Sequence, residues 1–497
     1  MDYTDFTQVH PLRKTLSNVK RGIIALPKTI GVFLKSMAQG VAGLACDVFR
    51  VLKEMIAAFV YGDWQTRASF VLFGFGNVMR GQFVKGLLFF LCEIGYLLYM
   101  LFFGIRYVLK LPTLGTVVQE KVFDEVQGIY VYTTGDNSMK ILLFGVLSLV
   151  VTLVFLAVYF LNVRSAYRAQ CLQAAGESLP SFRDDCCSLF DKRYHITLLS
   201  APILLVTLFT VLPLLFMVLI AFTNFDKAHQ PPGNLFTWVG FDNFAAMFGG
   251  NDQLGHTFSR LLVWTLIWSL FATFTNYLFG MILALLINKK GIRFKKFWRT
   301  IFIITIAIPQ FVTLMLMSQL LADEGAVNIL LKELGWIRES IPFLSNGTIA
   351  KIVVIAVNMW VGIPYSMLIT TGILLNIPAD MYESARIDGA GPVRAFFKIT
   401  LPYMLFVTTP YLITQFVNNI NNFNVIYLLT RGGPLTLEYF KAGKTDLLVT
   451  WLYKQTVEEQ NYNLAGVIGV IVFIITAVFS LIIYNSSSAS QKEEEFQ

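Results

Sequence analysis

Residues 378–402 read PADMYESARIDGAGPVRAFFKITLP, and this charged segment separates two long uncharged hydrophobic runs. The pattern predicts two short helices joined by a turn. Asp380 is suited to cap the first helix, and Glu383 follows at the spacing of a capping box. Gly389 and Gly391 are suited to end the first helix, because glycine favours a helix end. Pro392 is suited to begin the second helix, because proline favours the first helical position.

The composition of the chain is that of a membrane protein. Of its 497 residues, 56% are hydrophobic and 14% charged, whereas a soluble domain carries about 25% charged residues. A membrane-spanning helix needs about 20 mainly apolar residues, and eight runs qualify. They are Leu87–Ile105, Ile141–Leu161, Ile196–Thr223, Leu261–Ile287, Thr300–Leu321, Ile352–Leu375, Tyr403–Leu429 and Leu464–Tyr484. We therefore predict an all-α integral membrane protein with about eight transmembrane helices.

Basic residues predict the orientation of these spans. The loop between the fourth and fifth runs carries six basic residues and no acid: Lys289, Lys290, Arg293, Lys295, Lys296 and Arg299. Short loops rich in Lys and Arg stay on the cytoplasmic side. With eight spans, both termini and the segment around Glu383 are then predicted to be cytoplasmic. The net charge of +8 is dispersed among such loops, so it indicates no nucleic-acid partner.

We divide the chain into four parts on this basis. Residues 1–86 are a basic cytoplasmic or interfacial region, and residues 87–195 hold two spans and a cytoplasmic linker. Residues 196–485 form a core of six helices, and residues 486–497 are a cytoplasmic tail.

The N-terminal part contains two hydrophobic segments that do not qualify as spans. Apolar residues recur at helical spacing over Thr29–Val60, which indicates a helix on the inner membrane surface or one packed against the protein. Ala68–Val78 is too short to span, and Gly74 and Gly76 interrupt it. Glu93, in the first span, is a candidate functional group, and the alternative is a carboxyl group that is protonated or bonded to a neighbouring helix.

Uncharged polar residues gather in the later spans. A buried amide needs hydrogen-bond partners, and amides also suit a ligand rich in hydroxyl groups. The alternative is that these amides join neighbouring helices. Proline and glycine interrupt the same spans, which predicts broken helices that line a cavity: Pro309, Gly362, Pro364 and Pro410.

The charged segment resembles a motif of one family. In inner-membrane permease subunits of ABC importers, a cytoplasmic loop reads Glu-Ala-Ala, then three residues, Gly, nine residues, and Ile-x-Leu-Pro. This chain matches with Glu383, Ser384, Ala385, Gly389, Ile399, Leu401 and Pro402, and departs only in having Ser384 for the first Ala. The resemblance implies that this EAA loop holds a helix that docks on an ATPase, with polar contacts from Glu383 and Arg386. Asp388 is a further coupling residue, and Gly389 would set the turn.

Three further stretches are similar to the larger, MalF-type permease subunit of maltose and maltodextrin importers. They begin at Asn358, Asn418 and Ala442, within a similarity expected to cover Ile196 to Tyr484. The resemblance implies sugar contacts at Asn358, Val361, Gly362, Tyr365, Asn418, Asn419 and Asn422, with Gln310 at a further position. Ile306 and Gln310 depart from the Tyr and Ser of the family pattern, which leaves the glycan open.

The resemblance also implies partners. These are a second, MalG-like permease subunit, a MalK-like ABC ATPase dimer that binds ATP and Mg, and an extracellular solute-binding protein anchored as a lipoprotein. Besides these proteins, this chain would contact carbohydrate and membrane lipid, and it would need no cofactor of its own. The short loop Asn224 to Arg260, where enterobacterial members insert a large domain, favours the cell membrane of a Gram-positive-type bacterium.

The sequence shows no catalytic or metal-binding pattern. Phosphate-loop spacing is lacking, and the five cysteines lack the spacing of a zinc site or a disulfide framework. The expected function is therefore import of malto-oligosaccharides by alternating access, with ATP hydrolysis in a separate subunit. The alternatives are a permease for another oligosaccharide such as galacto-oligosaccharide, a secondary transporter, and a membrane scaffold without transport activity.

Overall fold

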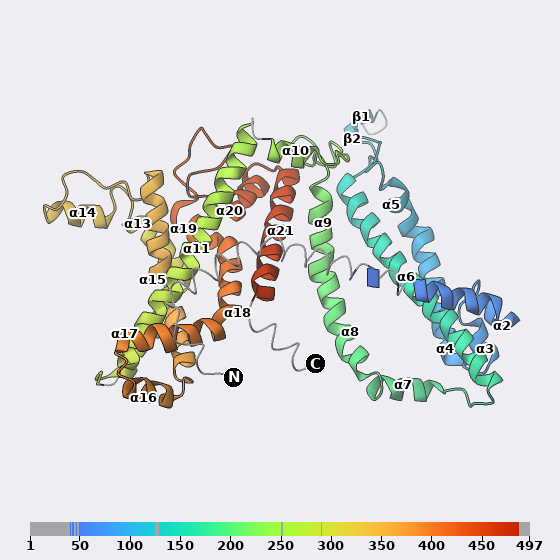
Figure 1. Ribbon diagram of the computed structural model, residues 1–497. Coiled ribbons are helices and arrows are strands. Elements are labelled where there is room, and N and C mark those ends of the chain that lie inside the picture. The colour runs from blue at the N-terminus through green and yellow to red at the C-terminus, as the bar shows by residue number, and fades with distance from the viewer. Residues whose placement is uncertain are drawn as a thin grey trace. The chain divides into compact units, whose positions relative to one another are not determined.

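The computed structural model describes residues 40, 42–43, 46, 49–124, 129–249, 252–289 and 291–486, and its regular secondary structure is almost all helix (Figure 1). It forms two compact units. In the described part, one unit runs from residue 40 to Asn243 and includes Asn461–Gly466. The other comprises Phe244–Gln460 and the chain from Val467 onward. Most of the helix predicted over Thr29–Val60 lies outside the described residues; residues 49–60 are helical.

The N-terminal unit holds three spans and the short segments before them. Its helices are α2 (Trp64–Ala68), α3 (Phe75–Met79), α4 (Phe83–Tyr99), α5 (Ile105–Lys110), α6 (Ser138–Ala174), α7 (Phe182–Phe190), α8 (Tyr194–Val206) and α9 (Leu212–Ile220). A π-helical turn joins α4 to α5, and another joins α8 to α9. The strands β1 (Lys121–Asp124) and β2 (Ile129–Tyr132) pair antiparallel between α5 and α6. This hairpin was not expected from the sequence.

Hydrogen bonds fix the short segment before the first span. The Phe73 amide donates to Glu93 Oε2 at 2.9 Å, and the Gly74 amide donates to Asn162 Oδ1 at 2.7 Å. Asn162 Nδ2 in turn donates to the Ser69 carbonyl at 2.8 Å. Buried polar groups need such partners. Glu93 is thus bonded to a neighbouring segment, and the short helices α2 and α3 do not span, as predicted.

The second unit holds the remaining spans. Its helices are α10 (Asp242–Phe248), α11 (Gln253–Asn288), α12 (Lys295–Ala307), α13 (Gln310–Leu320), α14 (Ala326–Glu333), α15 (Gly347–Leu374), α16 (Ala379–Ile387), α17 (Pro392–Ala395), α18 (Leu401–Ile420), α19 (Phe423–Thr430), α20 (Leu448–Tyr453) and α21 (Tyr462–Ser486). Among the described residues, seven helical stretches are long and apolar enough to cross a membrane. The bent pair α12–α13 makes an eighth, so the predicted number of spans is confirmed.

The positions of the helix breaks differ in part from the prediction. The chain bends by 87° between α12 and α13, where Pro309 lies, as expected. Gly362 and Pro364, in contrast, lie inside the unbroken helix α15, and Pro410 lies inside the unbroken helix α18. A proline in a membrane helix is tolerated when neighbouring groups satisfy the freed carbonyl. The seventh span instead breaks at Asn421 and Asn422, between α18 and α19.

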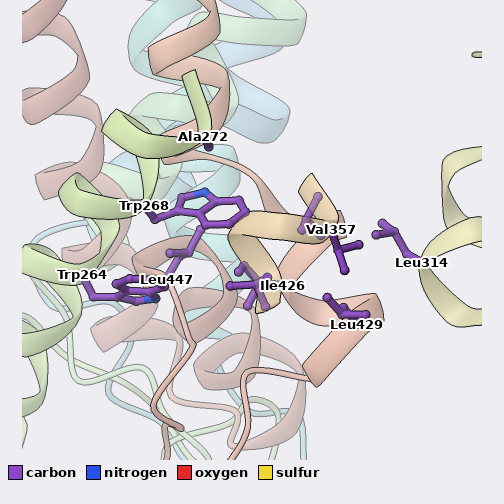
Figure 2. Packing of buried hydrophobic residues seen from close by; sticks show 10 residues of the cluster. Trp264, Trp268, Ala272, Leu314, Val357, Ile426, Leu429 and Leu447 are labelled. Carbon is purple, nitrogen blue, oxygen red and sulfur yellow. The ribbon is translucent and has the colours of Figure 1, made fainter. Parts of the chain in front are cut away.

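The core of this unit brings four spans together (Figure 2). Trp264 and Trp268 of α11, Val357 of α15 and Ile426 of α19 pack with Leu314 of α13 in one buried cluster. Each Trp also satisfies its indole N–H: Trp264 donates to the Thr445 carbonyl at 3.1 Å and Trp268 to the Asn419 carbonyl at 3.1 Å. The break at Asn421 and Asn422 is therefore attached directly to α11.

A buried ion pair fastens the loop that follows α19. Lys454 Nζ lies 2.6 Å from Asp446 Oδ2, and their side chains are 7% and 0% exposed. The carboxylate also accepts from the Gly443 amide at 2.7 Å and from the Thr450 hydroxyl at 2.8 Å. Burial raises the pKa of Asp446 above its usual range, and the charge of Lys454 and these hydrogen bonds offset that rise only in part. We call these four residues the Asp446 clasp.

Candidate functional site

The segment 378–402 folds as two helices joined by a turn, with one correction at its start. Gly389 has a φ of +74°, the left-handed conformation that favours glycine, and Pro392 opens α17. The predicted capping box at Asp380 is wrong, because α16 begins at Ala379 with Pro378 at its N-cap and has no side-chain capping bond. Asp380 lies within the first turn, where a carboxylate still interacts favourably with the helix dipole.

One side of α16 is attached to the protein. Tyr382 packs beside a buried cluster that contains Met281, Ile377 and Met404. Its hydroxyl lies 2.9 Å from Thr400 Oγ1, at the end of the turn that leads into α18. Packed side chains and a hydrogen bond therefore connect α16 to the start of α18.

The other side of α16 is open. Ile387 is 86% exposed and Met381 is also exposed, although both are large apolar residues. The motif residues fall into two groups by solvent exposure. Those exposed are Glu383, Ser384, Arg386, Asp388, Gly389 and Pro402, and those partly buried are Ala385, Ile399 and Leu401. Exposed apolar side chains ringed by charged residues are typical of a protein interaction surface.

The residues proposed for sugar contact on α15 share one helix face. Asn358, Val361, Gly362 and Tyr365 follow a spacing of three and four residues, which places them on one side of a helix. Tyr365 is 47% exposed, whereas Asn358 is buried and its Nδ2 has no hydrogen-bond partner among the described residues.

The amides at the α18–α19 break are largely engaged within the protein. Asn419 Nδ2 donates to Thr273 Oγ1 at 3.0 Å, and Asn419 Oδ1 accepts from Asn422 Nδ2 at 3.2 Å. Asn422 Oδ1 caps α19 by accepting from the Val425 amide at 3.2 Å. Asn418 is exposed. Asn419 and Asn422 thus hold the helix break in shape, and Asn418 is free of such a bond among the described residues.

A small polar cavity lies among α11, α15 and α18. Its volume is about 50 Å³, and it brings together three predicted residues, Gly362, Tyr365 and Asn419. Asn358, Val361, Asn418, Asn422 and Gln310 do not line it. The lining side chains carry no charged group; the polar ones are Thr273, Asn276, Tyr277, Tyr365, Ser366, Tyr411, Gln415 and Asn419. A space of this size holds a few waters at most, and an oligosaccharide needs a larger site.

Asn276 is one of several residues in this cavity that were not predicted as site residues. A Cβ atom on Gly362 would lie 2.2 Å from Asn276 Nδ2, so the glycine is what lets α15 approach α11 here. Asn276 Oδ1 is buried and has no partner among the described residues. The available signal was Asn276, the one amide side chain in the predicted span Leu261–Ile287, beside Thr273 and Tyr277.

The comparison with protein families matches residues 276–491 to the family described as "Binding-protein-dependent transport system inner membrane component". This range includes α16, the helix breaks and most residues of the polar cavity.

Curated relatives extend the similarity. The galactooligosaccharides transport system permease protein GanP of Bacillus subtilis (strain 168) is 35% identical over 428 residues, 84% of this chain and 96% of GanP. The maltodextrin transport system permease protein MdxF of the same organism is 34% identical over 433 residues, 85% of this chain and 95% of MdxF. The maltose/maltodextrin transport system permease protein MalF of Escherichia coli (strain K12) is 35% identical over 264 residues, 52% of this chain and 51% of MalF. The similarity is therefore wider than the expected range Ile196 to Tyr484.

Proposed function

We propose a function from one premise: this chain belongs to the MalF-like family of inner-membrane permease subunits of carbohydrate ABC importers. It is a multi-pass membrane protein. In our proposal it is the larger of two permease subunits and carries malto-oligosaccharides into the cell by alternating access. Its termini are cytoplasmic, in a bacterium of Gram-positive type.

The exposed face of α16 is the observation that carries this proposal. The helix presents Met381 and Ile387 beside Glu383 and Arg386, while Tyr382 holds its other side to the protein. An ATPase subunit that received this face in a cleft would bury the apolar residues and pair the charged ones. Its closure on ATP would then push α16 and, through Thr400, move α18. ATP and Mg are bound by that subunit, and this chain needs no cofactor.

The second permease subunit completes the sugar route. The cavity among α11, α15 and α18 is too small for an oligosaccharide, so the site opens only when paired helices separate. Tyr365 and Asn418 are exposed and would contact sugar directly; Asn358, Val361, Gly362 and Gln310 would shape the wall. Asn419 and Asn422 would support this wall through the hydrogen bonds that fix the helix break.

The chemistry of the lining supports a neutral sugar. Amide and hydroxyl groups hydrogen-bond to sugar hydroxyls, and the cavity has no charged side chain among its lining residues. A proton- or ion-driven secondary transporter would need ionisable groups there. An extracellular solute-binding lipoprotein would deliver the sugar to the outer face. A galacto-oligosaccharide is the second candidate, because GanP and MdxF are nearly equally similar to this chain.

Transport assays on the co-expressed complex in proteoliposomes test this function. Uptake of labelled maltotetraose should require ATP and the binding protein, and should exceed uptake of a galacto-oligosaccharide. Tyr365→Ala should lower uptake about tenfold, which corresponds to about 1.4 kcal/mol. Trp360→Ala is the matched control, since Trp360 is an exposed aromatic residue on another face of α15.

Each part of the proposal, namely the mechanism, the substrate and the sugar route, has a result that would contradict it. Uptake that persists without ATP and collapses with the ion gradient would indicate a secondary transporter. Preference for the galacto-oligosaccharide would replace the substrate but leave the transport mechanism standing. Equal uptake by the Tyr365 and Trp360 variants would remove α15 from the sugar route.

A further inference from the structure

A large cavity in the N-terminal unit lies outside the transport machinery described above. It measures about 680 Å³ and is formed by the beginning of α4, the end of α6, the helix α7 and the beginning of α8. Residues of the first and second spans contribute to it, and so does the linker that leads to the third. This is the part of the chain for which the proposed transport cycle gives no role.

The lining is strongly basic. It contains five basic residues, Lys85, Arg164, Arg168, Lys192 and Arg193, against the two acids Asp184 and Asp185. Both acids are engaged: Asp185 pairs with Lys85 at 2.8 Å, and Asp184 accepts from the Ser181 amide and hydroxyl at 2.9 and 2.8 Å.

Three of the five basic residues have no carboxylate partner in the described part of the chain. Arg164 lies 3.1 Å from Glu54, in an exposed pair. Arg168, Lys192 and Arg193 form no ion pair with a described residue. Three cations in one cavity repel one another, and a bound anion would relieve that repulsion.

The same cavity also has apolar walls, from Phe89, Leu161, Leu172 and Ile196. A second cavity of about 620 Å³ shares Leu161, Arg164 and Arg168 with it and is mainly apolar. Its apolar walls come from Val51, Met55, Ala157, Phe160 and Val163. The two arginines of α6 therefore stand between an apolar groove and a cationic one.

The cavity lies at the level where apolar spans give way to polar chain. The apolar run of α6 ends at Leu161, and Arg164 follows within one helical turn. The apolar run of α8 begins at Ile196, within one helical turn of Lys192 and Arg193 in the sequence. Residues at such edges lie at the depth of phospholipid head groups, and the abundance of Lys and Arg places this edge on the side predicted to be cytoplasmic.

We propose that this cavity binds an anionic phospholipid of the inner leaflet. The phosphate of its head group would be held by Arg168, Lys192 and Arg193. One acyl chain would follow the apolar groove beside Leu161 and Phe160. A free phosphate would satisfy the cationic groove alone, whereas a lipid accounts for both grooves and for their position at the membrane edge.

Native mass spectrometry of the complete transporter complex, taken from nanodiscs of mixed phosphatidylglycerol and phosphatidylcholine, tests this site. We expect the complex to retain phosphatidylglycerol in preference to phosphatidylcholine. The triple variant Arg168→Gln, Lys192→Gln, Arg193→Gln should lose that preference at least tenfold, because each cation near a membrane surface contributes about fivefold in affinity. The single variant Arg168→Lys, which keeps the charge, should retain it.

The matched control removes three basic residues from the loop between α11 and α12, with Lys289→Gln, Arg293→Gln and Lys296→Gln; it should behave like the wild type. If the first triple variant does not fold, Arg193→Gln alone should show about a fivefold loss. Equal losses in both triple variants would mean non-specific attraction and would overturn the proposal. Displacement of the lipid by about 10 mM inorganic phosphate, a concentration at which a soluble-anion site of millimolar affinity would be filled, would overturn it as well.

Discussion

The Asp446 clasp gives the sharpest test of how the outer segment of the second unit is held. We predict that Lys454→Met destabilises this segment and that the loss grows with pH. The methionine keeps most of the apolar volume of the lysine but leaves the Asp446 carboxyl, which is 0% exposed, without its cation. Hydrogen bonds from Gly443 and Thr450 remain. Removal of one partner from a buried ion pair typically costs about 3–5 kcal/mol.

Protonation of Asp446 limits this cost. In the variant the buried carboxyl can take up a proton, at about 1.36 kcal/mol for each pH unit above an unfolded-state pKa of about 3.9. The limit is then about 5 kcal/mol at about pH 7.5 and about 2 kcal/mol at about pH 5.5. The sign follows from proton binding: burial raises the pKa of Asp446, and the charge of Lys454 offsets part of that rise. Without Lys454 the folded state keeps the proton to a higher pH than the wild type does, so the loss of stability in the variant grows as pH rises.

Tryptophan fluorescence during thermal unfolding of the purified complex is a suitable assay. Trp264 donates a hydrogen bond to the Thr445 carbonyl and Trp451 to the Phe440 carbonyl, so both report on this segment. The control Lys441→Met removes an exposed pair with Glu459 at 3.2 Å and should cost about 0–1 kcal/mol. Equal midpoints for the two variants, or a Lys454→Met loss that does not change with pH, would refute the reasoning.

Two further predictions concern helix packing and acid stability. Gly362→Leu should reduce uptake at least tenfold, about 1.4 kcal/mol or more, because its Cβ would lie 2.2 Å from Asn276 Nδ2. The control Gly372→Leu, on the same helix, places its side chain in open space and should transport normally. Normal uptake by Gly362→Leu would contradict the close approach of α15 to α11. Burial alone would raise the pKa of Asp136, but hydrogen bonds from Lys110 and from the Thr116 and Val117 amides outweigh it and lower the pKa. The stability from Asp136 is therefore present above about pH 4 and lost as pH falls below it. Thermal melts of Asp136→Asn should lack this acid-side loss, and a melt identical to the wild type across that range would exclude the contribution.

The sequence was sufficient for the membrane class, the number of spans and the α16 turn. Long apolar runs, Gly389 and Pro392 act locally, so their structural effect can be read without knowing distant contacts. The capping box failed because Pro378 starts the helix one residue earlier than Asp380 would require. The hairpin β1–β2 was missed because its strands are only four residues long.

The site depended more on tertiary contacts. The resemblance to the permease family selected Asn358, Val361, Gly362 and Tyr365, which helical spacing places on one face of α15. It did not reveal that Asn419 bonds to Thr273 or that Gly362 faces Asn276, because these contacts join residues far apart in the chain. The break of the seventh span was predicted at Pro410, since proline is the usual cause of a kink. In the structure it lies at Asn421 and Asn422.

The central claim is that α16 transmits the force of an ATPase to this chain. The most direct measurement is ATP-driven sugar uptake, together with co-purification of the ATPase, for the variant Met381→Asp, Ile387→Asp. Both side chains are exposed on α16, so the permease should still fold and insert. We predict that the ATPase no longer co-purifies and that uptake falls to background, while the control Leu437→Asp, at an exposed residue of the loop after α19, retains both. Full uptake with the ATPase still bound to the α16 variant would contradict the account.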